Sequence, residues 1–252
     1  MIEVRPFNAL GRFENDWLAA RYHFSFAGYH DPSRMGLGPL RVWNDDTIQP
    51  GTGFDLHGHR DMEIITYVRR GAISHRDHLG NEGRTEAGDV QVMSAGTGIL
   101  HAEHNLEDDT TQIFQIWIEP ATAGVRPRWE ARRFPKADRA GELVALASGR
   151  TEDTSADPEG PLPIHQDAAI LGATLKAGQS VTHVLGPQVL GPQVRGPQVR
   201  GRGRKAYLVP ATGRIEVDGQ TAEARDGVAI SQVEAITITA LEDSEILLAD
   251  LA

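Results

Sequence analysis

The chain has 252 residues, enough for one large β domain or two of ordinary size, and 40% of them are hydrophobic, which is enough for a core. A formal charge of −10 argues against direct nucleic-acid binding, which needs a basic footprint. The absence of cysteine excludes disulfides and thiolate sites and fits a cytoplasmic protein. No run approaches the roughly 18 apolar residues of a membrane span, and the first ten residues lack a signal-peptide layout. We therefore expect no membrane contact and a small molecule as ligand.

Most segments are predicted to form short strands bounded by turn residues, because glycine (27) and proline (14) are frequent. Weak helical patterns at Asn15 to Tyr22 and Ala137 to Ala147 could each form a short helix. The clearest predicted strands span, in chain order, 38–43, 62–68, 89–93 and 112–118. Many short strands at close spacing predict an all-β fold, either a sandwich, a jelly roll or a barrel.

The two halves of the sequence resemble each other, which indicates a duplicated β unit. The shared pattern is a four-residue strand segment, a glycine and a turn leading into another strand. It occurs at 65–68, 71 and 87–90, and again at 206–209, 213 and 225–228. Residues 148–163 are polar and contain proline, so we predict a linker there between an N-terminal domain (1–147) and a C-terminal domain (164–252).

Residues 184–204 read VLGPQVLGPQVRGPQVRGRGR, a pentapeptide repeated three times and then broken. Proline at every fifth residue removes hydrogen-bond donors, so a central strand is not expected. We favour an exposed, mobile loop lengthened by tandem duplication, because surface loops absorb insertions at little cost. The alternative is a basic-tipped loop that contacts a partner.

Four residues with metal-ligating side chains lie in two pairs, each with a spacing of two. His57 and His59 form one pair, and His101 and Glu103 form the other. Residues two apart in a strand point to the same face, about 6–7 Å apart, and imidazoles placed so can converge on one ion at roughly 2.0–2.1 Å. Glu63 has the parity of the first pair but lies further along, so spacing alone leaves open which glutamate joins the site.

The remaining histidines lack partners at such spacing. We expect them to be surface groups or groups beside the site, and they are His23, His30, His75, His78, His104, His165 and His183. His183 stands near the place in the second half that corresponds to His57 and His59 in the first. No second histidine lies beside it, and no His-x-Glu follows it. The C-terminal domain is therefore expected to be metal-free and structural.

The segments HGHRDMEIITYV, which begins at His57, and GDVQVMSAGTGILHAEHN, which begins at Gly88, resemble the two cupin motifs. Their wording is similar to the pirin family, especially its bacterial members described as quercetin 2,3-dioxygenases. The resemblance covers the first half, including FSFAGYHDP and LRVWNDD, and is more diffuse over the second. It implies two tandem cupin domains, each a double-stranded β-helix barrel. Ser94 stands where cupins usually have proline, which is expected to alter a turn.

The resemblance also implies a ligand set and a reaction. In pirins the carboxylate ligand lies two residues after the second-motif histidine, which assigns one metal ion to His57, His59, His101 and Glu103. Glu63 is then left beside the site or in the pocket.

Iron(II) is expected on family grounds, with Mn, Ni, Co, Cu or Zn as other options, because affinity alone favours Cu, Ni or Zn. Three histidines and one carboxylate leave two exchangeable positions on a six-coordinate ion, which suits a dioxygenase that cleaves a flavonol such as quercetin with dioxygen. Glu103 is the expected general base. The alternatives are a non-enzymatic, metal-dependent regulatory or redox-sensing binding protein and, more weakly, a cupin isomerase.

Overall fold

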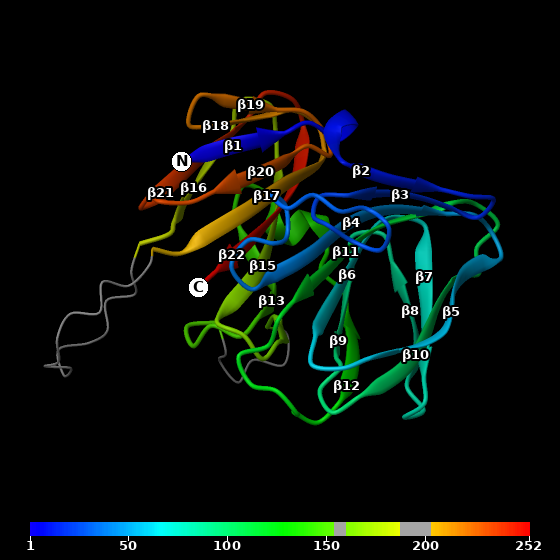
Figure 1. Ribbon diagram of the computed structural model, residues 1–252. Coiled ribbons are helices and arrows are strands. Elements are labelled where there is room, and N and C mark those ends of the chain that lie inside the picture. The colour runs from blue at the N-terminus through cyan, green and yellow to red at the C-terminus, as the bar shows by residue number, and fades with distance from the viewer. Residues whose placement is uncertain (154–159, 187–202) are drawn as a thin grey trace, which may run out of the picture.

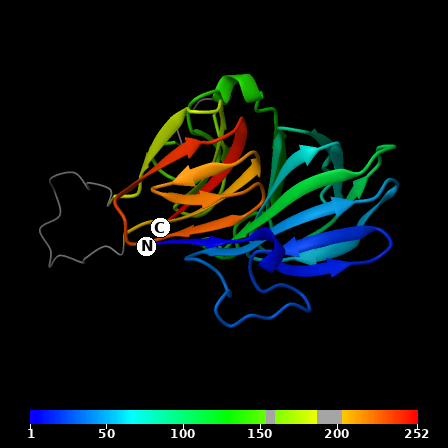
Figure 2. The same ribbon diagram turned by 90° about the horizontal axis from the view of Figure 1, so that it is seen from above.

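The computed structural model describes residues 1–153, 160–186 and 203–252, and it is built almost entirely from strands. Figures 1 and 2 show two β barrels lying side by side, so the expected all-β architecture is confirmed. The helices within the described ranges are single 3₁₀ turns, η1 (Phe7–Ala9) and η2 (Lys136–Arg139). Neither approaches the length or apolar content that a membrane-spanning helix needs.

The first barrel is formed by a seven-stranded and a four-stranded antiparallel sheet. The larger sheet has the order β12-β9-β6-β11-β4-β3-β2. Its strands are β2 (Gly11–Glu14), β3 (Leu18–Tyr22), β4 (Leu40–Ile48), β6 (Glu63–Arg70), β9 (Val90–Ser94), β11 (Thr111–Ile118) and β12 (Arg128–Arg132). The smaller sheet, in the order β5-β10-β7-β8, consists of β5 (Thr52–His59), β7 (Ala72–Asp77), β8 (Glu82–Glu86) and β10 (Ile99–Asn105). The strands predicted at 38–43, 62–68, 89–93 and 112–118 are all present, as β4, β6, β9 and β11.

The second barrel repeats this strand order, although the pair at one end of its larger sheet is parallel rather than antiparallel. Its larger sheet has the order β1-β20-β17-β22-β15-β13-β14, and its smaller sheet has the order β16-β21-β18-β19. The larger sheet contains β1 (Ile2–Arg5), β13 (Val144–Ser148), β14 (Leu162–Pro163), β15 (Ala168–Leu175), β17 (Lys205–Thr212), β20 (Gly227–Ile230) and β22 (Ser244–Leu251). The smaller sheet contains β16 (Ser180–Val184), β18 (Ile215–Val217), β19 (Gln220–Ala222) and β21 (Ala235–Ala240). The repeated order explains the repeated sequence pattern, because β6 corresponds to β17 and β9 to β20.

Two strands from the N-terminal part of the sequence belong to the second barrel. β1, from the extreme N-terminus, pairs with β20 of the second barrel, as Figure 1 shows by its blue strand among orange ones. There it takes the place that β12 has beside β9 in the first barrel. β13 also belongs to the second barrel, where it pairs with β15. Residues 2–5 and most of 144–148 were expected in the N-terminal domain. The placement differs because β1 pairs at one edge of the larger sheet of the second barrel and β13 pairs between β15 and β14.

The two segments with weak helical patterns can be compared directly with the structure. The short helix expected at Asn15 to Tyr22 is wrong: the side chain of Asn15 accepts hydrogen bonds from the backbone N–H groups of Trp17 and Leu18, which makes a turn that leads into β3. At Ala137 to Ala147 the structure has the end of η2 and the start of β13. The repeat loop lies mostly in 187–202, outside the described residues, as do residues 154–159 of the expected linker.

A buried apolar layer joins the two barrels. Trp43 and Phe114 of the first barrel pack against Tyr207 and Leu247 of the second, and all four side chains are fully buried. Polar contacts cross the same layer: Arg139 donates to Glu245 at 3.0 Å and to the hydroxyl of Tyr67 at 2.8 Å. The outward face of the larger sheet of the first barrel therefore packs against the second barrel. Its inward face is free to line a site.

Candidate metal centre

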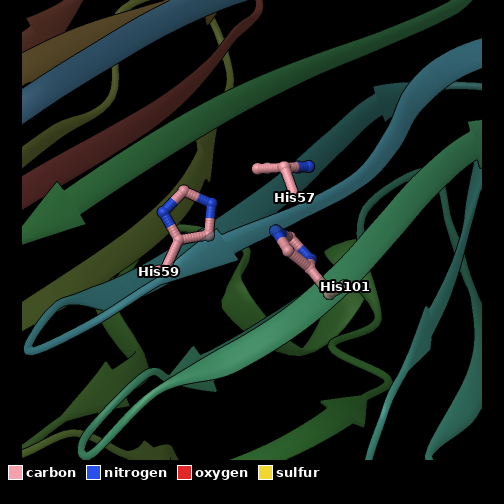
Figure 3. Close-up of side chains that lie close together, drawn as sticks. All are labelled: His57, His59 and His101. Carbon is pink, nitrogen blue, oxygen red and sulfur yellow. The ribbon is translucent and has the colours of Figure 1, made fainter.

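Three histidines point toward one another inside the first barrel (Figure 3). His57 and His59 come from β5, and His101 comes from the neighbouring β10, where it pairs directly with His57. Their ring centroids are 4.8 Å (His57–His59), 4.5 Å (His57–His101) and 5.0 Å (His59–His101) apart. The nitrogen atoms that could bind a metal all lie within 4.8 Å of one another. The same-face spacing in β5 thus brings the predicted imidazoles together.

The free nitrogens of this cluster fit a metal ion. The Nδ1 of His57 lies 2.7 Å from the backbone carbonyl oxygen of Asp55, so this nitrogen carries the proton and the Nε2 lone pair remains available. The Nε2 of His101 is buried and has no hydrogen-bond partner, which is costly unless a ligand binds there. A buried imidazole with a bare nitrogen is the donor that a divalent metal requires.

Burial keeps His59 and His101 in their neutral, metal-binding form. Burial and then the neighbouring His57 lower the pKa of His59 to about 4 and that of His101 to about 2. Burial also lowers the pKa of His75, against the hydrogen bond to Asp77, which raises it. At neutral pH His59 and His101 therefore carry no positive charge that would repel a cation.

Glu103 lies on the same face of β10 as His101, two residues further along, and is buried. Its carboxylate accepts hydrogen bonds from the hydroxyl of Thr66 (3.3 Å), the amide of Gln115 (2.8 Å) and the amide of Gln91. Burial raises the pKa of Glu103 to about 7, although these three hydrogen bonds lower it. Among the described residues, the cluster of ligand atoms within 4.8 Å contains the three histidines but not this carboxylate.

Two glutamine amides are held in fixed orientations around Glu103. The indole N–H of Trp117 donates to the Oε1 of Gln115 at 3.1 Å, which leaves the Gln115 Nε2 to donate to Glu103. The hydroxyl of Thr85 donates to the Oε1 of Gln91 at 2.9 Å, with the same result. Sequence reasoning missed both glutamines. The feature that could have revealed them is a polar side chain within an otherwise apolar, buried strand, Gln91 in β9 and Gln115 in β11.

Aromatic rings form one wall beside the histidines. Trp117 meets His59 edge to face at a centroid distance of 4.9 Å, and Phe26 meets Trp117 in the same way at 5.4 Å. On the outer side a surface cavity of about 380 Å³ opens next to His59, and Arg60, His78 and Leu100 also line it. The cluster therefore lies near the surface, between an apolar wall and an open side.

Glu63 does not join the site, which corrects the expectation that it lies beside the metal or in the pocket. Its carboxylate is buried on the outward face of β6, where it accepts hydrogen bonds from Ser94 (2.7 Å) and from the Nδ1 of His165 (3.2 Å). The cause is the turn between β5 and β6, in which Asp61 has a φ of 47°. This turn interrupts the alternation of side chains between the two faces of the sheet. Glu63 therefore does not point to the same face as His57, although their residue numbers differ by an even number. His165 is accordingly a bridge between the barrels.

The other histidines have varied surroundings. His75 is buried against His101, so it lies beside the site as one of the two expectations had it. His23 was also expected at the surface or beside the site, and this was wrong. It is fully buried between the barrels, where its Nδ1 contacts the hydroxyl of Tyr207 at 2.9 Å. His104 faces the other side of β10 and contacts Asp55.

The second barrel has an ionic cluster near its own β16. His183 of β16 lies 3.0 Å from Oδ2 of Asp250. The same oxygen binds Arg150 (2.8 Å), and the other oxygen, Oδ1, binds Arg204 (2.5 Å). Asp250 occupies on β22 the place that Trp117 has on β11, since the two strands align from their C-terminal ends. Within the described part of the chain, no group of metal-ligating side chains like that of the first barrel occurs here.

Comparisons with known proteins show what this chain is similar to. Residues 3–118 match the family model named Pirin, and residues 193–251 match the model of the quercetinase C-terminal cupin domain. The chain is 57% identical over 252 residues, all of both chains, to a Pseudomonas aeruginosa protein named provisionally as a quercetin 2,3-dioxygenase. This chain belongs to the pirin family. It is also 39% identical over 253 residues to the quercetin 2,3-dioxygenase of Escherichia coli, covering 100% of this chain and 99% of that protein.

A solved pirin has the same fold. The crystal structure of the bacterial pirin YhhW from Escherichia coli in complex with nickel(II) matches with a TM-score of 0.86 and 36% identity, covering 100% of this chain and 99% of that one. The two barrels of this pirin-family protein are therefore tandem cupin domains, as the sequence motifs implied. Its three converging histidines can bind a metal ion.

Proposed function

We propose that this pirin-family protein is a metal-dependent dioxygenase that cleaves flavonols of the quercetin type, with one metal ion, iron(II) by preference, held by His57, His59, His101 and Glu103. The observation that carries the proposal is the convergence of three imidazoles, one with a buried nitrogen that has no partner. The names of the relatives and the nickel in the bacterial pirin support it. Glu103 enters the ligand set because it shares the face of β10 with His101.

The proposed reaction begins with the removal of a proton from the 3-hydroxyl of the flavonol. When bound, the metal supplies a Lewis acid that makes this hydroxyl more acidic and a place where dioxygen can approach the substrate. Glu103 accepts the proton, because it is the carboxylate that shares the face of β10 with His101. Gln91 and Gln115 hold its oxygens in place before and after the transfer.

The rest of the site excludes water and orients the substrate. Trp117 and Phe26 offer an apolar wall for a flat aromatic ligand beside His59. The deprotonated flavonol then reacts with dioxygen, whose two atoms bond to carbons 2 and 4 while the 2,3 and 3,4 carbon–carbon bonds break. Both atoms of dioxygen enter the ring-opened ester, and carbon 3 leaves with its oxygen as carbon monoxide. The histidines hold the metal and take no proton.

The test is Glu103→Gln, because an amide fills the same space but is a far poorer base. We expect this variant to keep much of its metal and to lose turnover of quercetin. The matched control is Glu107→Gln, which changes a partly exposed carboxylate bound to Arg84 outside the barrel and should leave turnover unchanged. Retained turnover in Glu103→Gln would remove this residue from its catalytic role.

One observation supports a second candidate function, the metal-dependent binding of a protein partner. Leu56 of β5, Leu100 near the start of β10 and Leu106 just after its end are 46–67% exposed. Large apolar side chains exposed on the same sheet are found at interaction surfaces. Metal-loaded protein that binds its ion but consumes no oxygen with any flavonol would favour this function over the enzyme.

A further inference from the structure

A second pair of polar side chains lies directly behind the histidine cluster. His75 of β7 is opposite Glu103 of β10, and its Nδ1 is 3.5 Å from the Nδ1 of His101. Its other nitrogen, Nε2, is 3.3 Å from a carboxylate oxygen of Asp77. The side chains of His75 and Asp77 are both inaccessible to solvent. Three groups thus form a row, from carboxylate to imidazole to the imidazole of His101.

Both members of the pair are fixed by their surroundings. The ring of His75 stacks on Trp129 at a centroid distance of 4.6 Å and an interplanar angle of 5°. Trp129 in turn lies so close to Gly83 that a Cβ there would be 2.2 Å from the indole ring. Asp77 accepts hydrogen bonds from the backbone N–H groups of Leu79 (2.9 Å) and Asn81 (3.0 Å). Neither side chain can turn without breaking these contacts.

This row determines where the protons lie. A carboxylate only accepts hydrogen bonds, so the Nε2 of His75 must carry a proton to donate to Asp77. A neutral imidazole has one N–H, and the Nδ1 of His75 is then an acceptor. It accepts from the Nδ1–H of His101. The remaining nitrogen of His101, Nε2, is left bare, and this is the buried atom that has no partner in the protein.

We infer that Asp77 and His75 are positioning residues that set the tautomer and the ring orientation of His101, so that its Nε2 is presented to the metal. This inference rests on the proposed metal centre and adds two residues that the cupin motifs do not include. Both act through His101 and touch neither metal nor substrate. Partners of this kind orient metal ligands and raise their basicity, and losing one typically costs about 10- to 100-fold in metal affinity.

The tautomers can be read directly in the metal-free protein by ¹⁵N–¹H correlation of the imidazole rings. We expect the proton of His101 on Nδ1 and that of His75 on Nε2. A proton on the Nε2 of His101 would overturn the inference. This measurement does not depend on the reaction: if the tautomers are as inferred but the protein binds no metal, the proposed function fails and the assignment of the row stands.

Variants of His75 separate a positioning role from mere packing. His75→Phe keeps a ring against Trp129 but has no acceptor, and we expect its affinity for Ni(II) or Co(II), measured by chelator competition, to fall about 10- to 100-fold. His75→Asn packs worse, yet its side-chain oxygen can take the place of Nδ1, so it should recover part of the affinity. A packing role alone predicts the reverse order, with Phe better than Asn.

Two further variants complete the test. Asp77→Asn offers an amide that can donate to the Nε2 of His75, which moves the His75 proton toward His101 and should weaken metal binding and shift the visible absorption bands of the Co(II)-loaded protein. The control is His23→Asn, which removes another buried histidine far from the cluster and should change neither. Wild-type affinity and absorption in both folded His75→Phe and Asp77→Asn would contradict the inference.

Discussion

His23 is expected to make the stability of the whole molecule depend on pH. The imidazole is fully buried between the barrels, and its pKa is lowered to about 3, first by burial and then by the positive charges of Arg5, Arg34 and other arginines. In the unfolded chain the same group titrates near 6.5. Between these two pKa values the unfolded state binds more protons than the folded state, so acid favours unfolding.

The size of the effect follows from the two pKa values. Above pH 6.5 His23 is neutral in both states and its titration contributes nothing. As the pH falls to 5, protonation of the unfolded chain alone lowers the free energy of unfolding by about 2 kcal/mol. The loss is about 4 kcal/mol at pH 3 and approaches about 5 kcal/mol only below that pH. The stability is therefore lost progressively from pH 6.5 downward.

Replacing His23 with Asn removes this titration and still offers a polar atom to the hydroxyl of Tyr207. We expect His23→Asn to be less stable than the wild type at pH 8, because a buried side chain is shortened, but to lose about 2 kcal/mol less than the wild type between pH 8 and pH 5. Urea unfolding followed by tryptophan fluorescence measures both curves. Parallel curves for the two proteins over this range would refute the reasoning.

Two further predictions concern the second barrel and the aromatic wall. Asp250→Ala removes the carboxylate that the largely buried Arg150 and Arg204 share and leaves them with Asp153 and Asp167, so we expect the free energy of unfolding to fall by about 3 kcal/mol. Asp243→Ala, at an exposed ion pair, should change it little. Equal effects in urea unfolding would contradict this. Trp117→Phe keeps a ring beside His59 but loses the indole hydrogen bond to the amide that holds Glu103, so turnover should fall roughly 2- to 10-fold with metal content unchanged. Unchanged turnover would show that this hydrogen bond has no part in the reaction.

The sequence predicts the histidine cluster well because its geometry is local. His57 and His59 share a face by strand alternation alone, and the paired segment with His101 lies on the adjacent strand. The strands themselves follow from alternating or continuous apolar residues between turns. The family resemblance then adds the barrel topology, which local patterns leave open among three β architectures.

The parts that were not predicted depend on contacts between distant segments or on the geometry of a turn. Glu63 changes face because of the positive φ of Asp61, and nothing in the spacing announces such a turn. The pairing of β1 with β20 joins residues separated by most of the chain. His23 is buried only because the second barrel covers it. The row from Asp77 through His75 to His101 requires two strands in register, which a motif along one strand cannot reveal.

The most direct test of the proposed activity is oxygen uptake by wild-type protein loaded in turn with Fe(II), Mn(II), Co(II), Ni(II) and Cu(II), with quercetin as substrate. Elemental analysis should find one ion per chain, and His59→Ala should lack it. With at least one metal we expect oxygen to be consumed and carbon monoxide released in equal amounts. A protein that binds one ion at the three histidines but consumes no oxygen with any of the metals would contradict the dioxygenase function.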